Sequence, residues 1–311
     1  MTERTQLIIR TSWIGIIGNS ILSLLKIVLG FLSGSLAVVG DGIDSAGDII
    51  TSWITLFTAR VISRPPDTRY AYGYAKADTL ATLVLAFIIF FAGAQLSIST
   101  ITQLIKGEYN EIPSMVAVYV TLVSIAGKLI LSYIHFVTGK RIHSTMLIAN
   151  GKNMQNDVII SLGVLIGLFF TRVYDLPVID RIVALLISLW IMRVGLQIFF
   201  RTNIELMDGI SDPAIYDKII EAVSRVPKAE NPHRMRVHQI GTSYMITCDI
   251  EVNGAITVDE SHEIAKQVEE SIKTTIGNVY DVMVHVEPAG NVEREVYGVS
   301  DQEVKKNNPV K

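Results

Sequence analysis

The stretch DGIDSAGD, residues 41–48, places three aspartates inside a segment that is otherwise built from small and aliphatic residues. Asp41, Asp44 and Asp48 are three and four residues apart, so a helix would carry all three on one face. A charged aspartate in bilayer hydrocarbon costs about 2.5–3.5 kcal/mol on insertion scales. We therefore expect this face to meet water, a counter-charge or an ion. The alternative is a network of hydrogen-bonded carboxyl groups that packs helices together, for which serine or asparagine would serve as well.

The remainder of the chain is apolar enough to require a membrane. Its 311 residues are 50% hydrophobic and 18% charged, with a mean hydropathy of +0.40. Six segments approach the ~20 residues that cross a bilayer, and each must be helical because a lone strand would leave its backbone unpaired in lipid. They cover residues 12–33, 36–59, 79–104, 114–138, 147–170 and 180–200. The composition therefore predicts an α-helical membrane protein with six transmembrane helices in residues 1–203.

Basic residues indicate how these helices are oriented. They gather in residues 1–11, 60–78 and 139–146, whereas the opposite connections hold few of them. Cytoplasmic loops carry the excess of lysine and arginine, so the pattern predicts that both termini are cytoplasmic. We expect a multi-pass protein of the cytoplasmic (inner) membrane.

A second domain is predicted in residues 204–290. Helical spacing of apolar residues in 212–226 and 257–276, and alternation in 243–252, predict the order αββαβ, with the other two strands at 233–241 and 279–288. Thr257 and Glu260 have the spacing of a capping box at the second helix. This order suits a ferredoxin-like α+β domain with its helices on one face of the sheet. The polar tail, residues 291–311, is predicted to be disordered.

A second set of polar residues, in NGKNMQND at residues 150–157, complements the aspartates of residues 41–48. Asn150, Asn153 and Asp157 repeat the three-then-four spacing of the aspartates. Two helices that each offer oxygen ligands one turn apart can enclose a cation. Three carboxylates against a dication leave one negative charge, so the site can also hold a proton. The predicted membrane metal ligands are Asp44, Asp48, Asn153 and Asp157, with Asp41 and Asn150 as accessory candidates.

Several motifs together resemble the cation diffusion facilitator family. They are DSAGD in the second span, NMQND in the fifth, RPPDTRYAYGYAKAD between the second and third, and the αββαβ end. The resemblance covers about residues 5–290. It implies a homodimer in membrane lipid that exports a divalent transition metal in exchange for protons, and it places the cargo on the four ligands named above.

The resemblance also implies sites outside the hydrocarbon. Lys76 matches a basic residue that pairs with an acid after the sixth span, and Asp208 fits that partner, so the two would latch the dimer near the membrane surface. A cytoplasmic metal site is implied at the positions of His233, Asp249, His262, His285 and Glu287. A divalent ion bound there would either regulate transport or only stabilise the dimer.

The ligand at residue 153 bears on which metal is carried. Relatives often have histidine where this chain has Asn153. An all-oxygen site is harder than one with an imidazole nitrogen, which favours Mn²⁺ over Zn²⁺. Fe²⁺, Zn²⁺ and Co²⁺ remain alternatives, because the Irving–Williams order favours Zn²⁺ over Mn²⁺ in most sites.

Other features narrow the function class. The chain has no G-x-x-x-x-G-K-[ST] motif, so we expect no nucleotide, and a net charge of -3 suggests no nucleic-acid partner. The single cysteine, Cys248, excludes an internal disulfide. An enzyme is not expected; a passive cation channel and a membrane metal sensor are the alternatives to a transporter. Lys26, Lys128 and Arg193 lie within spans, where snorkelling and helix packing are open to all three. Lys128 is also a candidate to neutralise acids inside the bundle.

Overall fold

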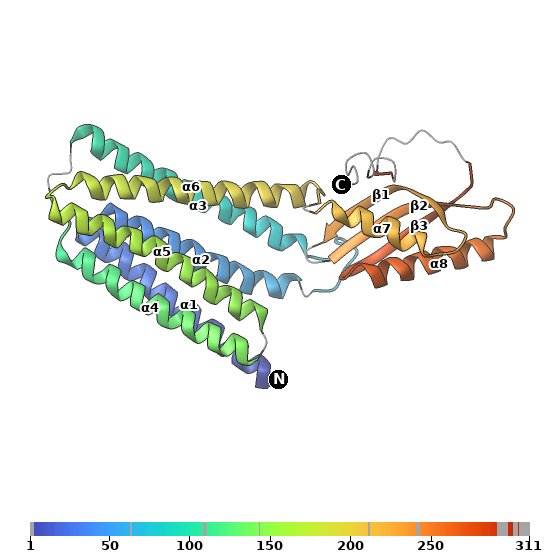
Figure 1. Ribbon diagram of the computed structural model, residues 1–311, viewed down its shortest axis with the longest axis horizontal. Coiled ribbons are helices and arrows are strands. Elements are labelled where there is room, and N and C mark those ends of the chain that lie inside the picture. Colours follow the sequence, from blue (N-terminus) through green and yellow to red (C-terminus); the bar gives the residue numbers. More distant parts are fainter. Residues whose placement is uncertain are drawn as a thin grey trace. The chain divides into compact units, whose positions relative to one another are not determined.

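The computed structural model describes residues 3–62, 64–107, 111–142, 144–210, 212–240, 243–290, 298–300 and 304. The chain divides into two compact units. One comprises Met1–Arg60 and Leu80–Phe200, and the other comprises Val61–Thr79 and Arg201–Lys311. Each unit has a hydrophobic core of its own. The first unit is helical, whereas the second combines a sheet with helices (Figure 1).

Six long helices lie in the described part of residues 1–206, in the order and near the positions that the hydropathy predicts. They are α1 Glu3–Leu32, α2 Leu36–Ile62, α3 Lys76–Lys106, α4 Met115–Arg141, α5 Thr145–Val173 and α6 Val178–Leu206. Of these described helices, five are long and apolar enough to cross a membrane; α2 is the exception. The reason is the aspartate series in its first half, so its place as a sixth span depends on how those acids are satisfied.

Close backbone approach holds α2 against α1. The turn between them places Gly34 at φ +74°, and the Asp180 carboxylate of α6 accepts hydrogen bonds from the Ser35 hydroxyl and the Leu36 amide. Further along, a Cβ on Gly42 would lie 3.0 Å from a backbone nitrogen of α1. Such contacts allow helices to pack closely where no hydrophobic effect drives them together.

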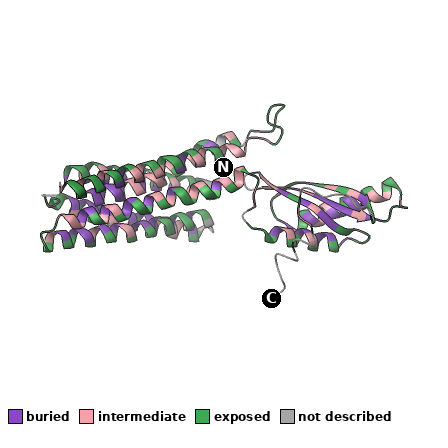
Figure 2. Cartoon of the chain, turned by 90° about the horizontal axis from the view of Figure 1, so that it is seen from above, coloured by how far each residue is buried: buried purple, intermediate pink, exposed green. Residues whose placement is uncertain are grey.

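The outward surface of the helical unit is apolar. Large aliphatic and aromatic side chains are exposed along it, among them Leu24 at 63%, Phe31 at 64% and Phe200 at 62%. In a protein surrounded by water, a patch of this extent would mark an interface. Figure 2 shows exposed residues along the outside of the helices and buried ones between them, which is the pattern expected for helices in lipid.

The second unit has the predicted αββαβ order. Its elements are α7 Ala214–Ser224, β1 Glu230–Ile240, β2 Ser243–Val252, α8 Val258–Thr275 and β3 Val279–Pro288. The sheet order is β1-β2-β3, with β1 antiparallel to β2 and β2 parallel to β3 across α8. The predicted α8 cap is confirmed, because the Thr257 hydroxyl accepts a hydrogen bond from the Glu260 amide at 3.2 Å.

The core of this unit lies between α7, α8 and one face of the sheet. Ile246, Cys248 and Ile250 of β2 point into it, so the alternate residues face the other side. Strand β1 differs from its prediction in beginning at Glu230, three residues before His233. Its register with β2 shifts on both sides of His233, which is how the longer strand accommodates the bulges.

Residues 298–300 belong to the segment predicted to be a disordered tail. In the structure, Val299 forms an antiparallel bridge with Met235 of β1, and their amides and carbonyls exchange two hydrogen bonds of 2.9 Å. Apart from these residues and Val304, the tail lies outside the described residues.

Candidate metal centres

A cavity of about 480 Å³ lies among α1, α2, α4 and α5. Its polar lining includes Asp48 of α2, Asn150 and Asn153 of α5, and His135 of α4. Asn19 of α1 also lines it, and among the described residues no hydrogen-bond partner meets its buried Oδ1 atom. The cavity reaches from Ile8 and Met146, near the beginnings of α1 and α5, to the aspartate of α2. Two helices therefore bring an acid and two amides to one space, as their spacing predicts.

The remaining predicted ligands are distributed around Asp48. The carboxyl groups of Asp48 and Asp157 lie within hydrogen-bonding reach of each other, and Asp157 is only 6% exposed. Asp44 lines a smaller groove of about 150 Å³, which Asp48 also reaches, on the side of α2 that faces α3 and α6. Asp48 is thus the shared member of all these contacts. Asp44 does not line the cavity that contains Asn153.

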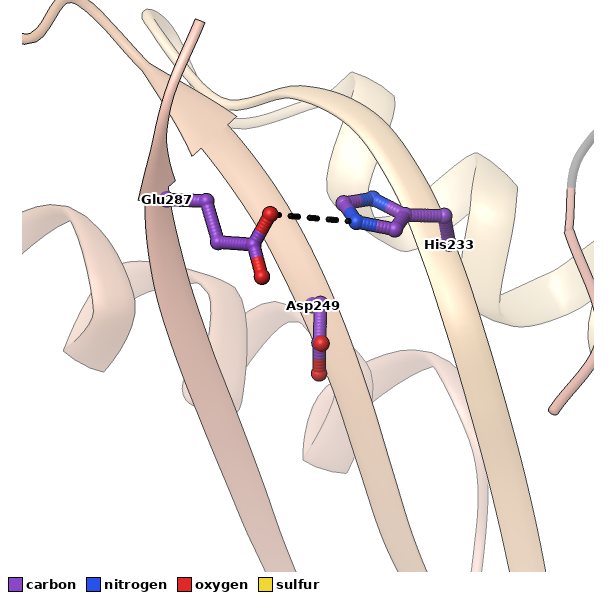
Figure 3. A group of neighbouring side chains, drawn as sticks. All are labelled: His233, Asp249 and Glu287. Atoms are coloured by element: carbon purple, nitrogen blue, oxygen red, sulfur yellow. Dashed lines mark ion pairs between the residues drawn. The ribbon is translucent and has the colours of Figure 1, made fainter. Parts of the chain in front are cut away.

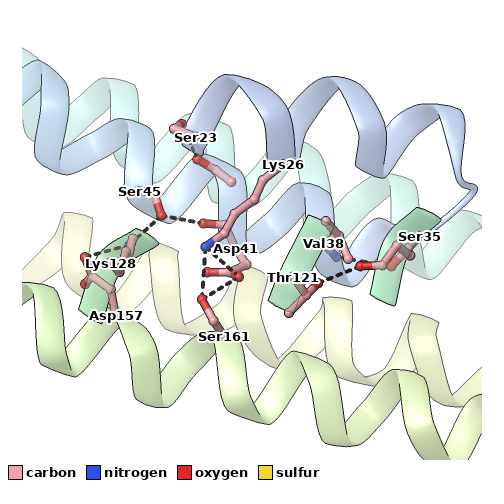
Figure 4. A network of polar contacts seen from close by, with 12 residues as sticks. Ser23, Lys26, Ser35, Val38, Asp41, Ser45, Thr121, Lys128, Asp157 and Ser161 are labelled. Carbon is pink, nitrogen blue, oxygen red and sulfur yellow. Dashed lines mark hydrogen bonds and ion pairs between the residues drawn. The ribbon is translucent and has the colours of Figure 1, made fainter. Parts of the chain in front are cut away.

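Two lysines contact the acids of this unit (Figure 4). The Lys128 ammonium of α4 lies 2.7 Å from Asp157 Oδ2 and donates a hydrogen bond to the Ser45 hydroxyl at 2.8 Å. Lys26 of α1 lies 2.8 Å from Asp41 Oδ2 and also donates a hydrogen bond to a serine of α5. Asp41 is therefore tied to a lysine on α1 and stands apart from the cavity.

These contacts decide among the roles that the sequence left open for the basic residues. Lys26 and Lys128 are both 0% exposed, so neither extends to the membrane surface. Each is a counter-charge to an aspartate. Arg193 instead lies over the ring of Trp190, 5.4 Å from its centroid.

The second candidate centre is on the sheet face opposite α7 and α8. The strand register sets His233 of β1 beside Asp249 of β2, and Asp249 beside His285 of β3. Glu287 follows two residues later on the same face. The ligand atoms of His233, Asp249 and Glu287 all lie within 4.8 Å of one another (Figure 3), and all three residues are buried. One nitrogen and carboxylate oxygens at this spacing suit a divalent transition metal.

Backbone contacts orient the imidazole of His233 for this purpose. Its Nδ1 lies 2.7 Å from the carbonyl oxygen of Asn231, which can only accept, so Nδ1 carries the proton. The Nε2 atom faces the site, 3.5 Å from Glu287 Oε2. A backbone carbonyl on the far nitrogen is the usual way that proteins orient a metal-binding histidine.

The other two predicted cytoplasmic ligands lie differently. The His285 Nε2 atom is 3.5 Å from Glu287 Oε1, but its side chain is 65% exposed and is not part of the close group. His262 is exposed just after the first turn of α8 and is not part of the close group. The sequence pattern did not single out Arg234, whose guanidinium lies 3.0 Å from Asp249 Oδ2 and 3.8 Å from Glu287 Oε1.

The predicted latch residues also meet within the second unit. Lys76 Nζ lies 2.8 Å from Asp208 Oδ1, with both side chains part-exposed. His238 Nδ1 contacts the same oxygen at 2.9 Å, and the ring of Tyr72 lies against that histidine. Asp208 therefore has two basic partners, one more than the sequence indicates.

The structure adds residues that sequence patterns could not assign. Ser45 is one of several small residues in α2, and Asn19 is a single asparagine in a mostly apolar helix, so neither forms a pattern. Arg234 directly follows a predicted ligand, but adjacent residues of a regular strand point to opposite faces. It reaches the site because Arg234 has φ +46°, a left-handed conformation at the bulge. A lysine inside a predicted span was the one sequence signal that pointed to Lys128.

Two family models match almost the whole chain. The cation efflux transmembrane domain matches residues 12–207, and the cytoplasmic domain of cation efflux proteins matches residues 211–289. The second model is that of a dimerisation domain.

Individual proteins match as well. A manganese efflux system protein of Bacillus subtilis is 29% identical over 86% of this chain and 91% of its own. An uncharacterised transporter of the same organism is 32% identical over 86% and 91%. The metal-bound C-terminal domain of a CzcD transporter from Thermotoga maritima is 40% identical over 25% of this chain and 92% of its own, with a TM-score of 0.25.

The transmembrane model alone spans more than half of the chain. It describes transporters, which break no substrate bond, so the prediction that the chain is not an enzyme is confirmed. The chain is a multi-pass membrane protein that belongs to the cation efflux, or cation diffusion facilitator, family of divalent metal transporters.

Proposed function

We propose that this protein exports Mn²⁺ from the cytoplasm in exchange for protons, as a homodimer in the inner membrane with both termini cytoplasmic. The observation that carries the proposal is the cavity that joins Asp48 to Asn150 and Asn153, beside Asp157. The predicted ligands in this cavity, Asp48 and the two asparagines, offer oxygen donors, which suit Mn²⁺. The imidazole of His135 also lines the cavity. Fe²⁺, Zn²⁺ and Co²⁺ are the alternative cargoes.

The manganese preference has two independent supports. The amide of Asn153 replaces the nitrogen donor that would favour zinc. In addition, two relatives that match most of this chain are named manganese efflux system proteins, at 29% and 24% identity. Because these identities are modest, the donor set is the stronger support.

The proposed cycle uses the two chemical properties of the site. Carboxylates must be deprotonated to bind metal, so a near-neutral cytoplasm favours loading through the cavity. In the outward-facing state, protons compete for the same oxygens and the cargo leaves. The cavity lining begins near Ile8 and Met146, at the end of the helices that the basic residues assign to the cytoplasm. Cargo would therefore enter the cavity from that side.

The cytoplasmic group would hold a resident metal. His233, Asp249 and Glu287 supply the donors, while His285 and the exposed His262 are candidates to complete the shell in a dimer. A metal there would neutralise Asp249 and Glu287 and tie β1, β2 and β3 together. The Lys76–Asp208 pair is proposed to secure the region near the membrane surface.

The test is metal flux into proteoliposomes with Mn²⁺, Fe²⁺, Zn²⁺ or Co²⁺, with and without a pH gradient. We expect Mn²⁺ flux that the gradient drives and that Asp48→Ala abolishes. Asn156→Ala is the matched control, since Asn156 is an exposed amide of α5 that does not line the cavity. Wild-type flux in Asp48→Ala would refute the site. Flux that ignores the gradient would indicate a channel, and binding without flux a sensor.

Metal preference is tested by Asn153→His, with Asn156→His as its control. Imidazole nitrogen is the better zinc ligand, so the ratio of Zn²⁺ to Mn²⁺ flux should rise only in Asn153→His. An unchanged ratio would show that Asn153 does not set the selectivity.

A further inference from the structure

Two ammonium groups are buried inside the helical unit. Lys26 and Lys128 are each 0% exposed, among the largest fully buried side chains of the described residues. An isolated ammonium in a dry interior costs so much that it must be paired. Both lysines are paired, and with residues of the same acidic cluster.

The two lysines pair with different aspartates (Figure 4). Lys26 contacts Asp41 and Ser161, and the Ser161 hydroxyl donates to Asp41 at 2.8 Å, which closes a network among α1, α2 and α5. Lys128 contacts Asp157, whose carboxyl group reaches Asp48. One lysine therefore serves an accessory acid and the other serves a proposed cargo ligand.

The charges of the aspartates and lysines nearly balance the charge of the cargo. The cluster contains the four carboxylates of Asp41, Asp44, Asp48 and Asp157, and the two lysines offset two of their charges. When all four carboxyl groups are deprotonated, the remaining two negative charges equal the charge of one divalent cation. A cluster of four carboxylates without the lysines would hold a dication with two charges in excess, and release would be correspondingly harder.

We propose that Lys128 is a tethered counter-cation of the transport site, which holds Asp157 when cargo is absent and competes with the cargo for it. The proposal rests on the proposed function of Asp48 and Asp157. Lys128 does not bind the metal; it acts through Asp157 and is a positioning residue. Its purpose is to lower the affinity for the dication so that the ion can leave on the far side.

The local contacts allow this competition. The Lys128 ammonium bonds to one carboxylate oxygen, Oδ2, and keeps a second partner in the Ser45 hydroxyl. When a dication takes Asp157, the ammonium retains that hydroxyl, which itself donates to the Asp41 carbonyl at 3.0 Å. Lys128 thus remains partly hydrogen-bonded in both states. A like charge left this close to the cargo weakens binding.

The experiment measures Mn²⁺ binding to purified full-length protein by titration calorimetry, and Mn²⁺ flux in proteoliposomes. Binding that Asp48→Ala removes is assigned to the membrane site. In the neutral isosteres Lys128→Gln and Lys128→Met, we expect Kd at this site to fall by about tenfold or more, because the competing charge is gone. In flux, KM should fall and the maximal rate should fall with it, since release becomes slow. Lys128→Arg keeps the charge and should stay near wild-type Kd.

Lys26→Gln is the matched control, since it removes an equally buried lysine whose partner is Asp41. Its effect on Kd should be clearly smaller than that of Lys128→Gln. Unchanged or weaker Mn²⁺ binding in the folded Lys128 isosteres would overturn the proposal and leave Lys128 as a structural clamp. If neither isostere folds while Lys26→Gln does, the clamp is likewise the conclusion. If the wild type shows no Asp48-dependent binding, the proposed function itself fails, and that result is separate.

Discussion

Both candidate metal centres pair a basic side chain with an acidic candidate ligand, but the two basic side chains differ in burial. In the helical unit, Lys128 contacts Asp157 at 2.7 Å; in the sheet unit, Arg234 contacts Asp249 at 3.0 Å. The lysine side chain is 1% exposed and the arginine side chain 30% exposed. Each basic group neutralises an acid that a metal would use. They differ in what happens when the metal arrives.

Burial decides that difference. A buried ammonium that loses its partners destabilises the protein by several kcal/mol, because water cannot reach it to hydrate the charge. A part-exposed guanidinium can turn into solvent and be hydrated there. The membrane centre is therefore suited to exchange, because an internal cation opposes retention of the cargo. The sheet centre is suited to a resident ion, because its basic side chain can leave the acids and be hydrated by solvent.

The largest effect should come from removing the acid in each pair. Asp157→Asn leaves Lys128 charged and buried, so we expect a loss of about 3–5 kcal/mol in the free energy of unfolding. Asp249→Asn leaves Arg234 with access to water, and a loss of about 1 kcal/mol or less is expected. Thermal and denaturant unfolding of the purified proteins measures both.

The double substitution Asp157→Asn with Lys128→Met serves as the control. It should recover the stability, because no unpaired charge remains, and should still lack flux. Equal losses in the two single variants would show that burial does not distinguish the centres.

A resident metal should stabilise the soluble segment 204–290. A ligand that binds only the folded form adds about 2.7 kcal/mol at a hundredfold excess over Kd. Mn²⁺ or Zn²⁺ should therefore raise its melting temperature at pH 7. At pH 5 the effect should vanish, because imidazole must be neutral to bind metal. His233→Ala should erase it, and the exposed His285 should matter less unless a dimer recruits it. A melting temperature that ignores metal would refute this centre.

The single cysteine reports on that unfolding. Burial is the main cause that raises the pKa of the Cys248 thiol to about 12. Below that pKa the thiol stays protonated, so at pH 8 a maleimide should label the folded segment slowly. The unfolded segment exposes a thiol with an ordinary pKa and should label fast. Added metal should slow labelling further, and rapid labelling of the folded segment would contradict the buried position.

Removing the charge of Arg234 tests how strongly an exposed basic group opposes metal binding. Arg234→Gln should tighten metal binding at the sheet centre by only about two- to fivefold, because water already screens the guanidinium. This is less than the change expected for Lys128→Gln. Isothermal titration of the segment 204–290 measures the effect. A tenfold or larger change would show that Arg234 opposes metal binding as strongly as Lys128 does.

The smallest effect should come from the Lys76–Asp208 pair. Its side chains are 40% and 49% exposed, so Lys76→Ala should change the free energy of unfolding by about 0–1 kcal/mol. The effect should shrink further in high salt, because exposed ion pairs are screened. A large and salt-independent loss would mean that the pair is covered in the assembled protein.

Much of the fold follows from local patterns in the sequence. Long apolar segments in lipid can only be helices, and the alternation in 243–252 and the Thr257 cap fix the elements of the sheet unit. Strand β1 was misjudged at its start because bulges interrupt the alternation near His233. Asp48, Asn150 and Asn153 could be assigned to one site, because helical periodicity alone sets their faces.

By itself, then, the sequence determined which residues share a helix face or a strand face, because those periods are set by backbone geometry over a few residues. It also determined that three aspartates in an apolar helix must have partners, since hydrocarbon leaves them none. Only the tertiary structure decided which partner each acid takes. Lys26 is 15 residues from Asp41 and Lys128 is 29 residues from Asp157, and no local rule relates such positions. Their pairing, like that of Arg234 with Asp249, comes from helix packing and strand register, which depend on the whole chain.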